Sequence, residues 1–366
     1  MYSTVHVVGA RPNFMKVTPV MDALRSLPDI KQTLVHTGQH YDENMSRVFF
    51  VQLGLQEPDV NLGVGSGSHA AQVANVMLRF EELVLARRPD LVLVYGDVNS
   101  TVAAALVCAK LGIKVAHVEA GLRSADRSMP EEINRLLTDR LADVLFTPSV
   151  DGNENLVREG IPAGRIHLVG NVMIDTLVRL LPKADELWED LSRRLQIDRQ
   201  SYVLVTLHRP SNVDDPQTLG RIVDTLVSLP GRLPIVFPVH PRTRARLAAL
   251  ERSGGADRIR FLDPLGYLEF LSLQRRSLMV ITDSGGIQEE TTFLGVPCIT
   301  VRKNTERPVT VQVGTNHLVG DDMDLLRSTY DAIRSHGGKK GAVPILWDGK
   351  AGARIAAVIG DLAHAG

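Results

Sequence analysis

The chain has 366 residues, of which 44% are hydrophobic, so it is long enough for about two domains with buried cores. Its 41 Lys and Arg residues against 42 Asp and Glu residues give a formal net charge of -1. This balance argues against a nucleic-acid-binding protein, which must neutralise phosphates, and against a protein held on membranes by a basic surface.

The two cysteines, Cys108 and Cys298, each lie in an apolar run, and we interpret them as buried structural thiols. They offer neither a metal-ligand spacing nor a disulfide framework. Residues 1–12 show no charged segment or cleavage site of a signal peptide, and no stretch has the length of a membrane-spanning helix. We therefore expect a soluble cytoplasmic protein without a membrane partner.

Short apolar runs alternate with helical patterns along the chain. Largely continuous apolar runs, typical of parallel strands buried on both faces, occupy Val5–Val8, Leu91–Tyr95, Ile113–His117, Tyr202–Thr206, Pro234–Pro238 and Leu278–Thr282. Helical spacing marks the segments between them, such as Ala70–Arg87, Thr101–Leu111, Glu131–Leu141 and Gln217–Leu229. This alternation predicts right-handed βαβ units and an α/β fold with doubly wound sheets.

The series is interrupted near Gly170–Pro182, and a long charged helix is predicted over Lys183–Leu195. We expect an N-terminal Rossmann-like domain over residues 1–172 and a C-terminal one over residues 173–349. The last helix, within residues 350–366, is expected to fold back on the first domain.

Charged or titratable side chains follow six predicted strands, three in each half. Open parallel sheets bind ligands at the carboxyl ends of their strands, so one cleft between the halves would collect these groups. They are Arg11, Asp97 and Glu119 in the first half, and His208, His240 and Asp283 in the second.

The segment Asp283–Glu290 is a candidate phosphate site. Gly285 and Gly286 stand at a strand-to-helix turn, where free N–H groups and the helix dipole favour an anion. An ordinary N-terminal cap explains the same residues equally well. Arg11 and Arg307, both in predicted loops, favour the phosphate interpretation, because Arg matches phosphate geometry. No P-loop and no Gly-x-Gly-x-x-Gly segment after a strand is present, which disfavours nucleotide hydrolysis and NAD binding.

Three acids stand where a ligand would bind. Asp97 has an alternative role as the cap of the following helix, and Glu131 as a favourable acid in a first helical turn. Glu119 has no such alternative, because it ends an apolar strand and a carboxylate there needs a partner. Three acids around one cleft would shift each other's pKa values and divide acid from base duties.

His208 and His240 follow strands of the second half and are candidates for ligand contact, although a lone histidine is usually structural. Two pairs have a spacing that metal ligands can have, His36 with His40 and Asp322 with Asp324, but neither predicts a metal site. Asp322 and Asp324 are more simply explained as acids at the start of a helix. We expect no metal and no cofactor, so a bound diphosphate would be met by Arg, His and helix N-termini.

The sequence resembles the non-hydrolysing UDP-N-acetylglucosamine 2-epimerases through most of its length. The segments that carry the resemblance are Gly9–Pro12 with Lys16, His36–Asp42, Tyr95–Thr101, His117–Arg123, Pro130–Arg135, His208-Arg209, Thr282–Glu290 and Thr305–Pro308. Each is weak alone, but together and in this order they are highly specific.

The resemblance implies two Rossmann-like domains facing a cleft (the GT-B arrangement), a homodimer, and a UDP-sugar as the ligand. It implies elimination of UDP to 2-acetamidoglucal, reprotonation of carbon 2 from the other face, and re-addition of UDP. The catalytic set it implies is Asp97, Glu119, Glu131 and His208. The diphosphate contacts it implies are Arg11, His240, Ser284, Gly285, Gly286 and Arg307. Glu290 would bind the ribose, Phe270 would lie near the uracil, and Lys16 and Arg135 would line the site.

Two segments depart from the family pattern, His208–Asn212 and Gly65–His69, at places where the family forms a second, activating UDP-GlcNAc site. Activation by substrate is therefore expected to be weak or absent. The segments Gly9–Pro12 and Met129–Arg135 also resemble those of relatives that act on UDP-2,3-diacetamido-glucuronic acid. A GT-B glycosyltransferase, a hydrolysing epimerase and a UDP-sugar sensor without activity remain alternatives.

Overall fold

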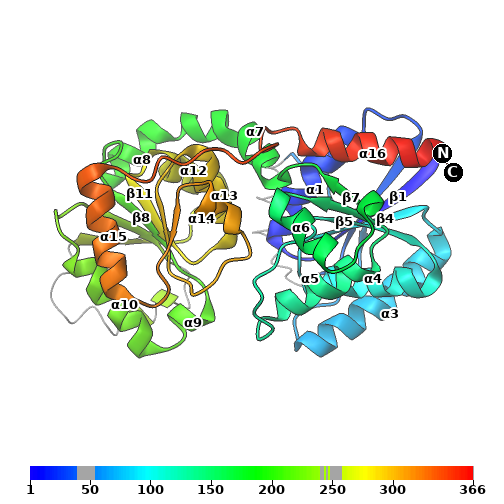
Figure 1. The fold of residues 1–366 in the computed structure, drawn as a ribbon, viewed down its shortest axis with the longest axis horizontal. Coiled ribbons are helices and arrows are strands. Elements are labelled where there is room, and N and C mark those ends of the chain that lie inside the picture. Colours follow the sequence, from blue (N-terminus) through cyan, green and yellow to red (C-terminus); the bar gives the residue numbers. More distant parts are fainter. Residues whose placement is uncertain (39–53, 240–242, 245, 248–257, 366) are drawn as a thin grey trace. The chain divides into compact units, whose positions relative to one another are not determined.

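The computed structural model describes residues 1–38, 54–239, 243–244, 246–247 and 258–365 (Figure 1). The chain forms two compact units. Unit 1 comprises Met1–Arg179 with Ile345–Gly366, and unit 2 comprises Leu180–Pro344.

Unit 1 is built on a parallel sheet with the strand order β3-β2-β1-β4-β5-β6-β7. The strand order reverses its direction between the neighbours β1 and β4, which is the switch point where doubly wound folds bind ligands. The strands are β1 (Tyr2–Val8), β2 (Ile30–His36), β3 (Val60–Asn61), β4 (Leu91–Tyr95), β5 (Lys114–Val118), β6 (Val144–Thr147) and β7 (Ile166–Leu168).

Helices cover both faces of this sheet (Figure 1). One face carries α1 and α16, and the other carries α3, α4 and α5, with α4 packed between its two neighbours. The helices are α1 (Arg11–Leu24), α3 (His69–Arg87), α4 (Asn99–Leu111), α5 (Pro130–Leu141), α6 (Val150–Arg158), the 3-10 turn Ala163–Arg165, α7 (Val172–Glu186) and α16 (Ala351–Ala365). Apolar side chains at alternate strand positions, such as Val5, Val7, Val92 and Val94, pack with Val76, Phe80 and Val84 of α3 into one core.

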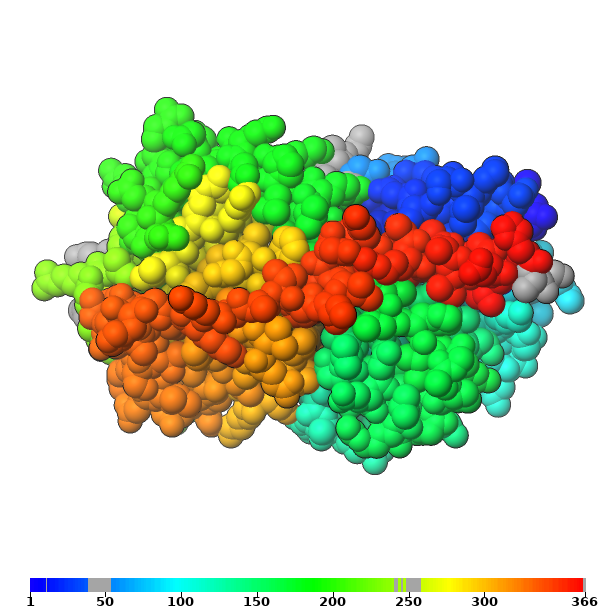
Figure 2. All heavy atoms as spheres, turned by 45° about the horizontal axis from the view of Figure 1, so that its top comes forward, coloured from blue at the N-terminus to red at the C-terminus, as the bar shows by residue number. Residues whose placement is uncertain are grey.

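The C-terminal helix α16 belongs to unit 1, where it packs along α1 (Figure 2). The carboxylate of Asp175 in α7 accepts hydrogen bonds from the backbone N–H groups of Ala351 (3.1 Å) and Gly352 (2.7 Å). These bonds satisfy two amides of the first turn of α16 that have no helical acceptor. Burial raises the pKa of Asp175 to about 6.

Unit 2 has a second parallel sheet with the strand order β10-β9-β8-β11-β12-β13. Its strands are β8 (Val203–Thr206), β9 (Ile235–Pro238), β10 (Ile259–Leu262), β11 (Met279–Thr282), β12 (Cys298–Thr300) and β13 (Asn316–Leu318). Its helices are α8 (Trp188–Leu195), α9 (Pro210–Val213), α10 (Pro216–Ser228), α12 (Tyr267–Arg276), α13 (Gly285–Leu294), α14 (Pro308–Gln312) and α15 (Met323–His336).

Alternation along the strands of unit 2 produces two cores, one on each face of the sheet. Val203 and Val205 face a cluster completed by α10 and α15, whereas Tyr202 and Leu204 face a cluster completed by α8 and α12. The predicted α/β class with doubly wound parallel sheets is therefore confirmed.

The predicted helix over Lys183–Leu195 is wrong. Helix α7 begins at Val172, continues through Pro182 to Glu186, and the boundary between the two units falls inside it. A separate helix, α8, follows from Trp188. Both cysteines are buried free thiols, as predicted. No helix among the described residues has the length and apolar character needed to span a bilayer.

Candidate active site

Three strands of unit 1 end side by side, and two of them are followed by predicted acids. β4 lies between β1 and β5 in the sheet, so the residues that follow these strands share one edge. Asp97 follows β4 and Glu119 follows β5, each close to the carboxyl end of its strand. This edge is the switch point of the sheet, where a ligand is expected.

Glu119 is buried, with only 6% of its surface exposed, and has the partner that its position requires. The ammonium group of Lys16, in α1, forms an ion pair with its carboxylate. The backbone of Glu119 has φ 73°, in the left-handed region, which costs a non-glycine residue about 1–3 kcal/mol. The N–H groups of Glu119 and Ala120 both donate to the carbonyl of Phe146, at 3.0 Å each. Strain of this kind, held by surrounding bonds, is typical of functional sites.

Gly96 leaves the space that this ion pair occupies. A Cβ atom at position 96 would lie 2.6 Å from Lys16 Nζ and 3.0 Å from Glu119 Oε2. The backbone of Gly96 also has φ 63°, which favours glycine. The glycine before Asp97 therefore permits the close approach of Lys16 to Glu119.

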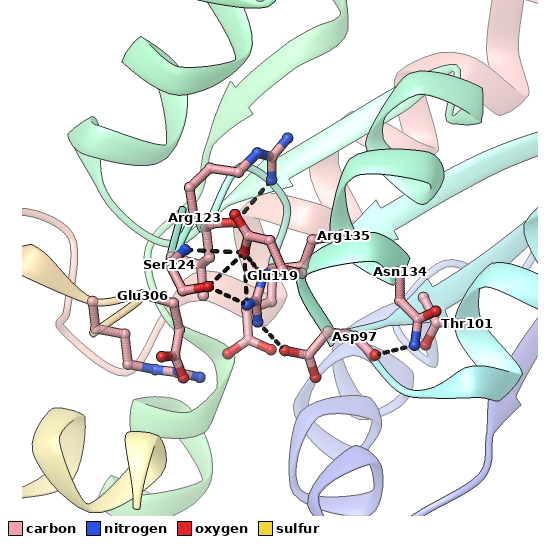
Figure 3. A network of polar contacts seen from close by, with 12 residues as sticks. Asp97, Thr101, Glu119, Arg123, Ser124, Asn134, Arg135 and Glu306 are labelled. Atoms are coloured by element: carbon pink, nitrogen blue, oxygen red, sulfur yellow. Dashed lines mark hydrogen bonds and ion pairs between the residues drawn. The ribbon is translucent and has the colours of Figure 1, made fainter. Parts of the chain in front are cut away.

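Asp97 does not cap the following helix, contrary to the alternative considered from the sequence. The N-cap of α4 is Val98, and Asp97 instead forms an ion pair with Arg135 of α5 (Figure 3). The neighbouring Asn134 donates to the backbone carbonyl of Asp97 at 2.8 Å. Two successive residues of α5 thus hold Asp97, whose side chain stays 27% exposed.

The adjacent acids Glu131 and Glu132 have different environments. Glu132 is buried and accepts hydrogen bonds from the backbone and hydroxyl of Ser124 (3.0 Å each) and from Arg135 (2.8 Å). These donors and the charge of Arg135 outweigh burial and lower the pKa of Glu132. Glu131, the second residue of α5, is partly buried and makes no hydrogen bond or ion pair with the described residues. Of the two, Glu131 is the acid available to a ligand.

Helix α5 also buries two acids, Glu132 and Asp139, that the sequence analysis did not single out. Its buried residues are Glu132, Asn134, Arg135, Thr138 and Asp139, whereas Ile133 and Leu137 are exposed. The helix therefore carries polar groups inside and apolar groups outside, the reverse of an ordinary surface helix. Charged residues at the spacing of a buried helical face were the signal that could have identified them.

In unit 2, the buried Asp283 organises the turn after β8. Its carboxylate accepts from the backbone N–H groups of His208 (3.1 Å) and Arg209 (3.0 Å), and from Asn212 Nδ2 (2.9 Å). His208 Nδ1 lies 3.0 Å from Asp283 Oδ1. Burial alone would raise the pKa of Asp283, but His208 and these donors lower it. Since the ionised carboxylate only accepts, Nδ1 of His208 carries a proton and Nε2 of this exposed ring is left for a ligand.

The N-terminus of α13 and Arg307, both predicted to contact an anion, lie against each other. Ser284 is the N-cap residue, but its side chain makes no capping bond, so the amides of the first turn lack that acceptor. A Cβ atom on Gly285 would lie 2.5 Å from Arg307 Nη1, so the guanidinium group lies against this turn. Arg307 is itself held by Glu289, at 2.8 Å from its Nε, and by Glu306. A cation next to a helix N-terminus suits a phosphate group.

Glu290, in the second turn of α13, is buried, and Tyr267 donates to its Oε1 at 2.9 Å. Burial raises the pKa of Glu290 to about 7. Phe270, in α12, is partly buried and packs against the core cluster that contains Tyr202 and Leu204.

Two predicted contacts are not described. The side chain of Arg11, the first residue of α1, and the whole of His240 lie outside the described residues. Two hollows on the described part of unit 2 are lined by other residues, such as Arg232 and His317. Among the described side chains, no three His, Cys, Asp or Glu residues are grouped as metal ligands.

Comparisons with known proteins agree along the whole chain. A family model described as UDP-N-acetylglucosamine 2-epimerase matches residues 22–360. The enzyme of that name from Methanocaldococcus jannaschii is 42% identical over 361 residues, 96% of this chain and 97% of that protein. Its crystal structure in complex with UDP-GlcNAc and UDP matches with a TM-score of 0.86 and 41% identity, covering 98% and 99% of the two chains.

A third relative bears on the sugar. The UDP-2,3-diacetamido-2,3-dideoxy-D-glucuronate 2-epimerase of Pseudomonas aeruginosa is 40% identical, over 97% of this chain and 99% of that protein. The family model and these identities span nearly the whole chain, and the fold of two Rossmann-like domains is that of the solved relatives. The chain belongs to the UDP-N-acetylglucosamine 2-epimerase family.

Proposed function

We propose that this protein interconverts UDP-GlcNAc and UDP-ManNAc without releasing the free sugar. The observation that carries the proposal is the match, at 42% identity and over 96% of the chain, to a curated UDP-N-acetylglucosamine 2-epimerase. The arrangement of charged groups supports it. Unit 1 places carboxylates at the switch point of its sheet, and unit 2 places Arg307 against a helix N-terminus.

The chemistry requires both sets of groups. The proton on carbon 2 is not acidified by an adjacent carbonyl, so its removal is coupled to the departure of UDP from carbon 1. Asp97, Glu119 and Glu131 would transfer protons on the sugar, and His208 would act from unit 2 through Nε2. Positive charge at the leaving diphosphate, from Arg307 and the first turn of α13, stabilises the transition state. The elimination gives UDP and 2-acetamidoglucal, and re-addition after reprotonation inverts carbon 2.

The residues of unit 2 would hold the nucleotide. Ser284, Gly285, Gly286 and Arg307, with Arg11 and His240, would bind the diphosphate. Glu290 would accept hydrogen bonds from the ribose hydroxyls, and Phe270 would lie near the uracil. Lys16 and Arg135 would keep Glu119 and Asp97 in place, as their ion pairs indicate.

Proton NMR in deuterated water, with purified protein and UDP-GlcNAc, tests this function. We expect signals of UDP-ManNAc to grow, with deuterium entering carbon 2 in both epimers. Free ManNAc with UDP would show a hydrolysing enzyme instead. Transfer to an added sugar acceptor, without exchange at carbon 2, would show a glycosyltransferase.

The relative from Pseudomonas aeruginosa supports a second candidate substrate, UDP-2,3-diacetamido-2,3-dideoxy-D-glucuronate. Both substrates lose the same carbon 2 proton, so the same residues serve either reaction. The NMR experiment with each UDP-sugar, compared by kcat/KM, decides between them. Exchange only with the uronic acid would replace UDP-GlcNAc as the substrate while keeping the reaction type.

We also propose a homodimer formed through the outer face of α3 and α5. Leu78 and Leu85 on α3 are 63% and 49% exposed, and Ile133 and Leu137 on α5 are 42% and 50% exposed. Both helices flank α4, so these side chains belong to one helical layer. Exposed apolar side chains on neighbouring surface helices are expected to be covered by a partner when they form a patch.

Light scattering coupled to gel filtration tests the dimer. We expect the wild type to have twice the chain mass of 40.1 kDa, and a Leu78→Asp, Leu137→Asp double variant to have the single mass. Leu325→Asp, at a side chain 44% exposed on α15, is the matched control and should remain a dimer. A monomeric wild type would refute the proposal.

The two buried free thiols further support a reducing compartment, and we propose the cytoplasm.

A further inference from the structure

A buried histidine links the two loops that carry Asp97 and Glu119. His117 lies in β5, with no exposed side-chain surface. Its Nε2 lies 2.8 Å from the carbonyl oxygen of Gly96, the residue before Asp97. Its Nδ1 lies 2.6 Å from Asp139 Oδ1, in α5. His117 itself stands two residues before Glu119, so the ring connects the ends of β4 and β5 with α5.

Asp139 holds the next part of the Glu119 loop. Its second oxygen accepts from the backbone N–H of Gly121 at 3.1 Å and from Arg123 Nη1 at 2.7 Å. Arg123 in turn forms two parallel bonds to Glu159, at 2.7 Å each. Burial would raise the pKa of Asp139, but the charges and hydrogen bonds of His117 and Arg123 lower it. The carboxylate is therefore ionised and can only accept hydrogen bonds.

Both ring nitrogens of His117 are engaged in these contacts. The carbonyl oxygen of Gly96 only accepts, so Nε2 carries a proton and donates to it, while Nδ1 pairs with the carboxylate of Asp139. His6, the other fully buried histidine of this sheet, has a tyrosine hydroxyl as its nearest partner at 2.7 Å, and burial lowers its pKa to about 3.

We propose that His117 and Asp139 are positioning residues for the epimerisation, which set the separation and direction of Asp97 and Glu119. This inference rests on the proposed function. Glu119 has a strained backbone at φ 73°, and the bond that the N–H of Gly121 donates to Asp139 holds the chain two residues further on. The bond from His117 to Gly96 holds the chain immediately before Asp97. The side chains of His117 and Asp139 are 0% and 1% exposed, so the pair would act through geometry and not by contact with the sugar.

Two substitutions separate the two bonds of His117. In His117→Gln the amide nitrogen replaces Nε2, keeping the donor to Gly96 and losing the bond to Asp139. In His117→Asn the amide nitrogen replaces Nδ1, keeping the donor to Asp139 and losing the bond to Gly96. We expect kcat to fall about 10- to 100-fold in both variants, because displacements near 1 Å have such effects. KM and the affinity for UDP should stay close to wild type, because unit 2 holds the nucleotide.

His6→Gln is the matched control for burial. It should lower the melting temperature as the His117 variants do, yet keep the wild-type kcat. If the His117 variants also kept the wild-type kcat, the pair would be merely structural and the proposal would be overturned.

Two measurements are independent of turnover. Nitrogen-15 NMR of histidine-labelled wild type should show a proton on Nε2 of His117, the nitrogen that donates to Gly96, assigned by the loss of this signal in His117→Gln. Hydrogen exchange at the amides of Gly96, Glu119 and Ala120 should be faster in both His117 variants than in His6→Gln. A His117 ring without a proton on Nε2, or unchanged exchange, would overturn the inference. Absence of epimerisation by the wild type would instead refute the proposed function. The NMR and hydrogen-exchange results could still be interpreted, because they do not depend on turnover.

Discussion

The ammonium group of Lys16 forms an ion pair with the carboxylate of Glu119, although the two residues are 103 positions apart in the chain. Lys16 lies in the helix after β1, and Glu119 follows β5. Strand β4 separates these strands in the sheet, and its own extension at Gly96 has no side chain to block the contact. Three separate segments therefore contribute to the environment of one acid.

Glu119→Gln should lower kcat about 10²–10⁴-fold, the usual contribution of a general acid or base. The affinity for UDP should be unchanged, because the carboxylate serves the sugar and not the diphosphate. Deuterium exchange at carbon 2 and calorimetric titration with UDP measure the two effects. Weakened UDP binding with retained exchange would contradict the assigned role.

The Lys16–Glu119 pair should behave as a coupled unit in stability. Lys16→Met leaves a buried carboxylate without its cation and should reduce the free energy of unfolding by about 3–5 kcal/mol. Adding Glu119→Gln removes that carboxylate charge, so the double variant should lose less than the sum of the two single losses. Urea unfolding of the four proteins measures the coupling. Additive losses would show that the two charges do not depend on each other.

Substitutions of two neighbouring glycines of α13 separate an effect on the stability of the proposed anion site from an effect on UDP binding there. Gly285→Ala should lower both stability and UDP affinity, because its Cβ would lie 2.5 Å from Arg307 Nη1. At Gly286 a Cβ meets no atom within 4 Å, so Gly286→Ala should keep or slightly raise stability. It should nevertheless weaken UDP if the diphosphate rests on this turn. Unchanged affinity for UDP in Gly286→Ala would place the diphosphate elsewhere. Arg307→Ala should weaken UDP binding and leave the acids of unit 1 unaffected.

Glu290 should link nucleotide binding to proton release. Burial raises its pKa from the ordinary 4.5 to about 7, so near neutral pH the carboxyl is partly protonated. Ribose hydroxyls donating to the carboxylate favour the ionised form, so binding should release a proton and affinity should rise between about pH 6 and 8. Titration of the Glu119→Gln protein with UDP-GlcNAc, in buffers of different ionisation enthalpy, measures the release. Glu290→Gln should abolish it.

The same group makes a prediction for stability. The pKa of Glu290 is higher in the folded than in the unfolded chain, so the folded state binds more protons between about pH 4.5 and 7. Its contribution to the free energy of unfolding must therefore decrease as the pH rises through this range. Urea unfolding at several pH values should show a shallower decrease in Glu290→Gln than in wild type. Identical slopes would contradict the raised pKa.

Activation by substrate should be weak or absent. In the segment Gly65–His69, where the family resemblance places part of an activating site, Ser68 and His69 form hydrogen bonds within unit 1. Ser68 accepts from the N–H of Ala71 at 3.3 Å as the cap of α3, and Asn99 donates to His69 Nδ1 at 3.1 Å. Initial rates should follow a hyperbola in UDP-GlcNAc concentration. A sigmoidal curve, or epimerisation of UDP-ManNAc that needs added UDP-GlcNAc, would disprove this.

Local patterns in the sequence were sufficient for the architecture. Continuous apolar runs predicted the central strands, with bounds that differ from the structure by one residue at Ile113–His117 and not at all at Leu91–Tyr95. The helix over Lys183–Leu195 was wrong, because Pro182 and the charged residues after it suggested a new start, whereas α7 continues through that proline to Glu186. A proline inside a helix runs against the local propensity on which the prediction relied.

The sequence by itself determined which residues follow the strands, and hence that Asp97, Glu119 and His208 stand at the carboxyl ends of the strands of the two sheets. It also indicated that the carboxylate of Glu119 needs a partner. Only the tertiary structure decided which groups pair: Lys16 with Glu119, Arg135 with Asp97, and Asp283 with His208. The reason is physical. Strand and helix propensities act over a few residues, whereas the charge that stabilises a buried acid comes from whichever segment the strand order brings beside it.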